Sequence, residues 1–373
     1  MRAMRSDPRY EAFAAELDEL KRRTLAKVGA EDVRYIRRLY YFSRFMEIVG
    51  RLFIHFSFEP LTFLFGVVAL WVHKQLQGTE IGHMALHGAY DRLPGADAFA
   101  SKRFRWDTTI DEEAWREGHN ARHHVHTNVD GKDPDMRFGP IHLTDRTRHS
   151  WRHDWQFLFM LGLITANFGF FMNAHFSGLT DLFLKDGPGM LPDRSRASRR
   201  RAWKMALRKY VPFYFNNYVF FPALAGLMFW NVLMFAKVML GNALAELIGN
   251  LYSAATIYCG HAGPDIDNFP AGHVARSRGE WYAMQVETTN NFEVVAPWSI
   301  LCGGLERHIE HHLFPTLPAP RLREIAPEVR AICARHGVEY RTGSWPVMLK
   351  KALGHIRRLA QDGGARAVVQ ELV

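Results

Sequence analysis

The sequence predicts an all-α integral membrane protein with about four transmembrane helices in two hairpins and a cytosolic helical cap. The first observation is that apolar residues gather into long blocks between strongly charged segments, with aromatic residues making up 13% of the 373 residues. The second is that the basic residues behind the net charge of +9 flank these apolar blocks. Such flanking is typical of proteins that face an anionic membrane surface. We therefore expect a membrane partner and no nucleic-acid partner.

The first hairpin is predicted over about residues 39–76. Before it, residues 1–38 are expected to form a cytosolic, membrane-hugging lead with an amphipathic helix whose apolar side carries Phe13, Leu17 and Leu20. Residues 39–58 are apolar except for polar residues spaced three or four apart, which form one stripe along a helix: Arg44, Glu47, Arg51 and His55. The stripe is expected to lie in the membrane interface or to pack inward. Residues 61–76, opened by Pro60, are more uniformly apolar.

The second hairpin is predicted over residues 211–258, which are long enough for two spans of ~20 residues each, with a turn within 230–237. Residues 185–209 are densely basic and should therefore lie in the cytosol. If the apolar segment 155–176 crossed fully, it would separate the polar regions that hold the histidine clusters described below. We therefore predict that 155–176 is re-entrant or interfacial. Residues 39–340 then form one membrane domain, and residues 341–373 form a cytosolic C-terminal tail.

Eight of the nineteen histidines fall in three short boxes. The boxes read GHMALHG, GHNARHHVHTN and ERHIEHHLFP, and their histidines are His83, His87, His119, His123, His124, His308, His311 and His312. Residues three and four apart share one face of a helix, so each box aims several imidazoles at one place. An adjacent pair such as His123 and His124 diverges by about 100° and can serve two ions at once. Imidazole is the commonest transition-metal ligand, so the pattern favours more than one metal ion.

A ninth candidate ligand is His261, where the last apolar block ends. The ring nitrogens that do not bind metal need hydrogen-bond acceptors; the candidates are Glu80, Asn120, Asp133, Asp135, Glu306 and Glu310. The remaining histidines that we considered are expected not to ligate metal: His55, His73, His126, His142, His149, His153, His175, His336 and His355. Zinc usually takes four ligands, often with cysteine, and haem needs one or two, so non-haem iron fits the boxes best.

The ordered set GHMALH, HNARHH and HIEHHLFP resembles the HxxxH, HxxxHH and HxxHH boxes of the membrane-bound fatty acid desaturases, over roughly residues 40–340. The resemblance implies that the eight box histidines are ligands of two iron ions and that His261 is the extra ligand after the last span. The HPGG haem motif of relatives with a fused cytochrome b5 domain is absent from this sequence, and those relatives often have Gln where this chain has His308. The acyl-CoA branch carries Asn where this chain has Ile257, so acyl-lipid and acyl-CoA substrates both stay open.

The implied activity is that of an oxidoreductase, a fatty acid desaturase that introduces a double bond into an acyl chain. It would use a non-haem diiron centre, O2 as co-substrate, and two electrons from a separate donor such as ferredoxin or cytochrome b5 with its reductase. The active site is expected to face the cytosol. The alternative is a hydroxylase or ketolase of the same superfamily acting on a lipid or carotenoid. Two further alternatives are a non-enzymatic membrane metal carrier and a basic nucleic-acid binder, for which the sequence contains no recognised motif.

Overall fold

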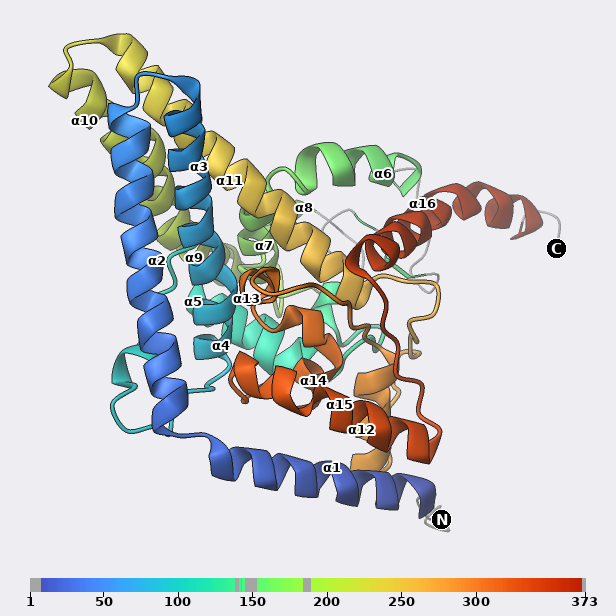
Figure 1. Ribbon diagram of the computed structural model, residues 1–373. Helices are drawn as coiled ribbons and strands as arrows, with labels where there is room; N and C mark the ends of the chain where they lie inside the picture. Colours follow the sequence, from blue (N-terminus) through green and yellow to red (C-terminus); the bar gives the residue numbers. More distant parts are fainter. Residues whose placement is uncertain (1–7, 138–140, 142, 145–152, 184–188, 371–373) are drawn as a thin grey trace.

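The computed structural model describes residues 8–137, 141, 143–144, 153–183 and 189–370, and the regular elements in these ranges are helices (Figure 1). The only β-type pairings among the described residues are two isolated bridges. The all-α part of the predicted fold class is therefore confirmed. Long helices project together from a cap of shorter helices, and α1 (Pro8–Lys27) lies along the opposite side of that cap (Figure 1).

Helices α2 (Ala30–Phe56) and α3 (Pro60–Leu76) form an antiparallel hairpin. They pack closely because Gly50 faces the other backbone: a Cβ there would lie 2.6 Å from the amide nitrogen of Leu70. The polar stripe of α2 packs inward, since Glu47 accepts hydrogen bonds from Arg44 (2.8 Å) and Arg51 (3.1 Å). Large apolar side chains cover the outer face of α2, including Tyr41, Phe45, Ile48, Leu52 and Phe56. A helix whose outward face is apolar and whose polar stripe faces the protein is suited to a lipid environment.

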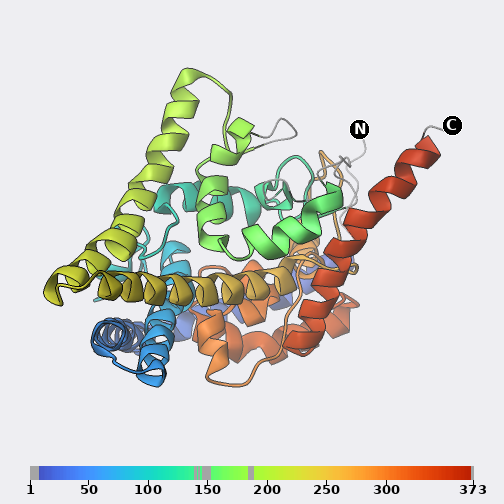
Figure 2. The ribbon, with the colours of Figure 1, turned by 90° about the horizontal axis from the view of Figure 1, so that it is seen from above.

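A second helical pair lies beside the first (Figures 1 and 2). Helix α9 (Arg196–Phe215) continues through the π-helix η7 (Asn216–Phe220) into α10 (Phe221–Met228), and the chain then turns at 229–231 into α11 (Val232–His261). The turn thus overlaps the start of the predicted range. Side chains at the turn are open to the surroundings, with Trp230 89% exposed. The basic residues of α9 and the apolar residues of η7 and α10 therefore belong to one nearly continuous rod.

One helix of the described residues, α11, is by itself long and apolar enough to cross a membrane. The sequence predicts more spans than this. The other long helices expected to span are more charged, shorter or interrupted, so they do not reach the same length and hydropathy. Helix α2 carries the inward-facing charges, α3 is 17 residues long, and η7 divides the α9–α10 rod. The segment predicted as re-entrant forms α6 (Gln156–Phe159), η6 (Met160–Ile164) and α7 (Phe168–Phe176), and its two halves are bent by 111°. It is not one straight helix.

The apolar face of α1 is covered by protein. Phe13, Leu17 and Leu20 are at most 2% exposed, in the core that α1 shares with α12 (Arg278–Glu287) and α15 (Ala319–His336). The apolar face of this helix therefore packs on protein, because periodicity shows that such a face exists but not what covers it; the cytosolic, membrane-hugging lead stays a prediction. The predicted C-terminal tail contains α16 (Trp345–Gln370), which packs on α11.

The cap is completed by short elements between the long helices. Its α-helices are α4 (Gly82–Leu86), α5 (Glu112–Trp115), α8 (Leu179–Phe183), α13 (Trp298–Cys302) and α14 (His308–Leu313). Its π-helices are η1 (Gln77–Ile81) and η3 (Arg116–His123), and its 3₁₀ turns are η2 (Asp97–Phe99), η4 (Pro134–Arg137), η5 (His153–Trp155) and η8 (Leu305–Arg307). These elements bring segments far apart in the sequence to one buried centre.

Candidate metal centre

Each histidine box lies on a short helical element in the cap, near the ends of the long helices that project from it. The first box follows α3 through η1 onto α4, the second occupies η3, and the third is α14. In the π-helix η3 the amide of His124 bonds to the carbonyl of His119, five residues back. Its wider turn places the Nε2 atoms of His119 and His124 3.1 Å apart, a pairing that α-helical spacing does not predict.

The structure brings all nine predicted histidines together. Ring centroids lie 4.6 Å apart for His83 and His311, 4.6 Å for His87 and His124, and 4.4 Å for His261 and His308. The three remaining rings also belong to the cluster: the ring centroid of His119 lies 5.1 Å from that of His87, that of His312 lies 4.3 Å from that of His124, and that of His123 lies 5.0 Å from that of His312. The eight box histidines are at most 7% exposed, and His261 is partly buried. Three distant stretches of sequence and the end of α11 thus meet at one point.

The ring nitrogens are spaced as ligands of metal ions are. Two nitrogens about 2.1 Å from one ion and at right angles to each other lie about 3 Å apart. The Nε2–Nε2 distances are 3.1 Å for His83 and His87 and 2.7 Å for His261 and His308. The Nε2 atoms of His123, His311 and His312 are buried without a hydrogen-bond partner among the described residues. Since buried polar atoms are normally satisfied, these nitrogens fit a bound cation.

The nitrogens fall into two groups that could each hold an ion. The atoms of the first group lie within 4.8 Å of one another, as do those of the second. The first contains His83, His87, His119 and His311, and the second contains His123, His261 and His312. His124 adjoins the first group through His119, and His308 adjoins the second through His261. The donor set therefore fits a pair of ions.

Most of the rings are neutral, which is the form that binds metal. Burial, followed by the neighbouring imidazoles, lowers the pKa well below the ordinary value for His83, His87, His124, His311 and His312. The same causes lower the pKa of His308 to about 3. For His123, burial lowers the pKa, but the charges of Asp133 and Asp135 outweigh it and raise the pKa to about 9.

Two of the predicted acceptors contact the rings. Both carboxylate oxygens of Asp133 lie 3.0 Å from Nδ1 of His123. Asp135 lies 3.7 Å from Nδ1 of His119 and 3.4 Å from Nε2 of His175, which therefore lies next to the cluster. In the described part of the chain, the ion pairs of these two carboxylates are with histidines. Carboxylates that bind the outer nitrogen of metal-bound imidazoles are a general feature of metal sites.

The other predicted acceptors bind backbone or other side chains. Asn120 donates to the carbonyl of Leu86 (2.8 Å), and Glu310 accepts from Asn291 (2.8 Å) and Tyr340 (2.8 Å). Glu80 and Glu306 both bind one arginine, as described below. One acceptor was missed: Gln285 of α12 lies 3.1 Å from Nδ1 of His312. No histidine box surrounds Gln285, so no sequence pattern indicated that it contacts the cluster. His142 and His149 lie outside the described residues.

A separate set of potential metal ligands, outside the nine histidines, is bound by an arginine. Glu47, His73 and Asp107 lie close enough to bind an ion. The same Nη1 of Arg44 lies 2.8 Å from Glu47 and 2.8 Å from Asp107, so a cation already bridges the two carboxylates. His73 bonds to Ser43 (2.9 Å) and lies 3.6 Å from each carboxylate. This group is an ion-pair network between α2, α3 and the cap.

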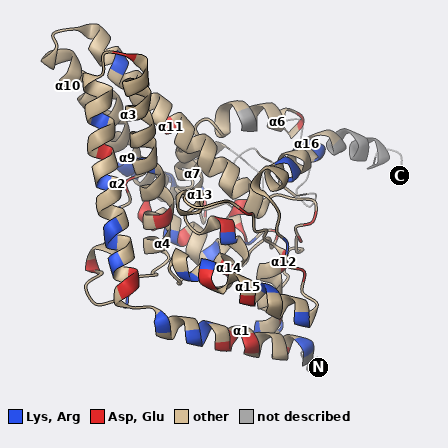
Figure 3. Ribbon diagram, viewed as in Figure 1, with Lys and Arg blue, Asp and Glu red and all other residues tan. Residues whose placement is uncertain are grey.

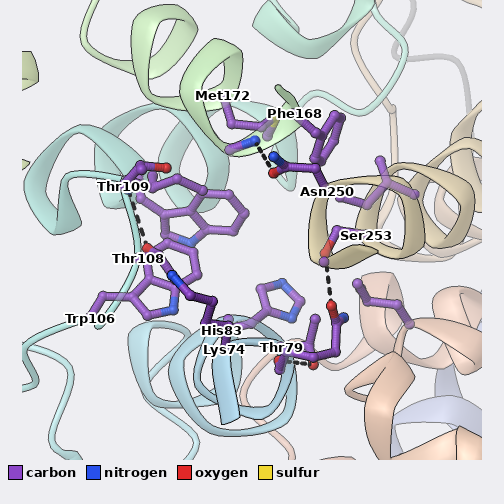
Figure 4. Close-up of a pocket in the computed structure, with 18 of the residues that line it drawn as sticks. Lys74, Thr79, His83, Trp106, Thr108, Thr109, Phe168, Met172, Asn250 and Ser253 are labelled. Carbon is purple, nitrogen blue, oxygen red and sulfur yellow. Dashed lines mark hydrogen bonds between the residues drawn. The ribbon is translucent and has the colours of Figure 1, made fainter. Parts of the chain in front are cut away.

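A pocket adjoins the histidines, and sequence patterns did not identify its lining (Figure 4). His83, His119, His261 and His308 form part of its wall. The rest combines apolar side chains, including Trp106, Ile110, Trp115, Phe168, Met172 and Ile257, with polar or charged ones, including Lys74, Asp107, Glu246 and Asn250. The bent segment 155–176 supplies Phe168 and Met172. Asn250 of α11 fixes the bend, because it donates to the carbonyl of Ala166 (2.9 Å) and accepts from the amide of Gly169 (3.0 Å).

Known proteins share this sequence pattern. The Fatty acid desaturase family model matches residues 58–344. An NADPH-dependent stearoyl-CoA 9-desaturase of Mycobacterium tuberculosis is 32% identical over 356 residues, which is 95% of this chain and 81% of the relative. An sn-1 linoleoyl-lipid 6-desaturase of Synechocystis is 23% identical, over 76% of this chain and 77% of the relative. No solved structure matches the chain.

The matched region contains all three boxes and His261, and the histidine clusters are typical of the metal site of this family. The resemblance seen in the boxes is therefore confirmed, and so is the assignment of the chain as a desaturase oxidoreductase. This chain belongs to the fatty acid desaturase family, whose members are membrane-associated.

Proposed function

We propose that this desaturase introduces a double bond into the acyl chain of an acyl-CoA at a pair of non-haem irons held by the nine clustered histidines. The observation that carries the proposal is that nine imidazoles converge, with nitrogens at metal-ligand spacing, beside an apolar pocket. One iron would be held by His83, His87, His119, His124 and His311. The other would be held by His123, His261, His308 and His312.

When bound, the irons supply with O2 and two electrons the oxidising power to break unactivated C–H bonds, which side-chain acids and bases cannot break. The side chains of this chain do the positioning. Trp106, Phe168 and Met172 give the pocket apolar walls, and Trp115 stacks on His119 with ring centroids 4.0 Å apart. If the pocket holds two adjacent methylenes of the acyl chain beside His83 and His308, their C–H bonds are already oriented toward the metal centre before reaction. Asp133 orients His123 through Nδ1, and Gln285 orients His312.

The acyl-CoA assignment rests on the relatives. The relative that covers 95% of this chain is a stearoyl-CoA desaturase with NADPH dependence in its name, whereas the linoleoyl-lipid desaturase is less identical. We extend both properties to this chain: the electrons would come from NADPH through a separate donor protein. Exposed basic residues of α9, among them Arg196, Arg199, Arg200 and Lys204, suit an anionic membrane surface or an acidic carrier.

We further propose four membrane crossings, made by α2, α3, the α9–α10 rod and α11, with the cap in the cytosol. The support is the apolar outer surface of these helices, whose projecting ends carry few charges (Figure 3). Cysteine substitutions at the exposed turns, Phe58→Cys and Trp230→Cys, should react with an impermeant maleimide in intact cells. Val274→Cys in the cap should react only after lysis. Reaction of all three only after lysis would refute the topology. The native cysteines are buried and contribute little background.

Product analysis tests the reaction. The chain is expressed in a host with a simple lipid profile, and its fatty acids are separated by chromatography. We expect a new monounsaturated acid without added oxygen, and purified protein that contains about two irons. A hydroxylated or ketone product would instead support the alternative activity of the superfamily. A protein that holds one zinc and no iron would refute the proposal.

A further inference from the structure

One arginine outside the histidine boxes joins the first box to the third. Arg323 of α15 donates from Nη1 and Nη2 to the two oxygens of Glu80, at 2.9 and 2.7 Å. Its Nε donates to Glu306 at 2.6 Å, and Nη2 also donates to the carbonyl of Ser299 at 2.8 Å. Both carboxylate side chains are buried, with exposures of 0% and 2%. One guanidinium therefore bridges two buried carboxylates.

The two carboxylates are attached directly to the boxes. Glu80 lies on η1, three residues before His83, in a helix that runs without a break from α3 into α4. Glu306 lies on η8, two residues before His308, where α14 begins. A shift of either carboxylate therefore moves a histidine helix. Across this junction the rings of His83 and His311 lie 4.6 Å apart.

Other contacts make the junction close-packed. Thr79 donates to the carbonyl of Leu301 (3.1 Å), and so does Gln75 (3.1 Å). Gly303 has φ +72°, and a Cβ there would lie 2.4 Å from Cβ of Thr79. The chain before the third box therefore lies directly on the helix of the first box. Close packing of this kind allows one relative placement of the two segments. Arg323 binds a carboxylate on each of them.

Arg323 is the cation that balances the charges of both carboxylates at this junction. Within the described residues, the ion pairs of Glu80 and Glu306 are with Arg323 alone. One oxygen of Glu306 has no hydrogen-bond partner among those residues. Removing the arginine would leave two buried carboxylates uncompensated, and like charges would then repel each other. Lysine cannot replace it, because an ammonium group lacks the planar fork that binds one carboxylate with two nitrogens and another with the third.

We infer that Arg323 is a positioning residue for the metal centre: it sets the separation of the first and third histidine boxes and thereby the affinity for iron. This inference rests on the proposed function, because it concerns the same nine histidines. It assigns no contact between Arg323 and the metal. Its effect is transmitted by Glu80 and Glu306 to the helices that carry His83, His87 and His311.

Arg321 offers a matched control on the same helix. It makes ion pairs of similar quality, donating to Asp32 at 2.9 and 3.1 Å and to Glu324 at 2.8 Å, and its partner Asp32 is 2% exposed. These contacts join α15 to α2 and touch no histidine box. A purely structural loss should therefore be common to both arginines, whereas a loss specific to the metal centre should follow Arg323 alone.

The experiment compares Arg323→Lys and Arg323→Gln with Arg321→Lys and Arg321→Gln in the full-length protein in detergent. Iron bound per folded protein is measured at graded free Fe²⁺, and thermal unfolding is measured in parallel. We expect the Arg323 variants to lose about 10- to 100-fold in iron affinity, as changes behind metal ligands do, while the Arg321 variants keep wild-type affinity at a lowered Tm. Wild-type iron affinity in Arg323→Lys, or equal losses in both pairs, would overturn the inference.

A second variant covers the case in which Arg323→Gln does not fold. Glu80→Gln with Glu306→Gln and Arg323→Gln removes all three charges together and should fold better than the single variant, yet still bind iron weakly. Wild-type iron affinity in this triple variant would also overturn the inference. Failure of the proposed function is recognised separately, because wild-type protein would then bind no iron pair or form no unsaturated product.

Discussion

Replacing Asp133 by Asn tests whether the carboxylate behind His123 holds a metal ligand in place. Three buried donors converge on Asp133: Nδ1 of His123 at 3.0 Å, the amide of Asn128 at 2.8 Å and the amide of Asp135 at 2.9 Å. The side chain is fully buried. An Asn side chain has one carbonyl oxygen in place of two, so it can still accept from His123 and Asp135 but turns its NH2 group toward the amide of Asn128.

The magnitude follows from these contacts. Asp133→Asn leaves about one buried donor unsatisfied, which costs about 1–3 kcal/mol of unfolding free energy. Asp133→Ala would leave three, at about 3–9 kcal/mol in all, which approaches the whole stability of many proteins. The Asn variant is therefore the informative one. Loss of the charged partner of a metal-bound imidazole should lower activity and iron affinity by about 10- to 100-fold.

The assay measures iron content, desaturated product and Tm in the same preparations. Asp91→Asn is the control, because Asp91 also accepts from a backbone amide, that of Ser101 at 2.6 Å, but its side-chain hydrogen bonds among the described residues are with Ser101 and not with a histidine. We expect both variants to fold and only Asp133→Asn to lose iron and product. Wild-type iron content and turnover in Asp133→Asn would refute the assigned role of the carboxylate.

Three further predictions concern the metal and the pocket. His311→Ala should abolish the new product and lower the iron content, whereas His126→Ala, outside the proposed ligand set, should keep both; product from His311→Ala would overturn the ligand assignment. Chelation of the iron should lower Tm, because ligand at 100 times Kd stabilises by about 2.7 kcal/mol, and added Fe²⁺ should restore it; an unchanged Tm would count against the site. Gly249→Leu should favour shorter acyl chains in the product profile, because Gly249 lines the pocket and a Cβ there makes only ordinary contact, 3.5 Å from Trp71; an unchanged profile would remove this face from the acyl site.

The histidine boxes and the all-helical fold were predictable from the amino-acid sequence, and the resemblance of the boxes to a known pattern indicated the family. Local spacing is sufficient for the boxes and the helices, since a helix places residues three and four apart on one face whatever surrounds it. The same reasoning identified the polar stripe of α2 and left its direction open between the interface and the interior. Packing against α3 and the cap decided that direction, because Arg44 binds both Glu47 and Asp107.

How distant segments meet was not predictable from the sequence and became visible in the folded chain. Three contacts connect residues far apart in the sequence: α12 and α15 cover α1, Gln285 contacts His312, and Arg323 joins two boxes. No periodic pattern encodes such contacts, because they arise from the shapes and charges of complete surfaces. The π-helix η3 is an intermediate case: its residues are local, but the pairing of His119 with His124 needs a wider turn than the spacing of residues in an α-helix implies. The chemistry of the site thus came from residue types in sequence, and its geometry came from packing.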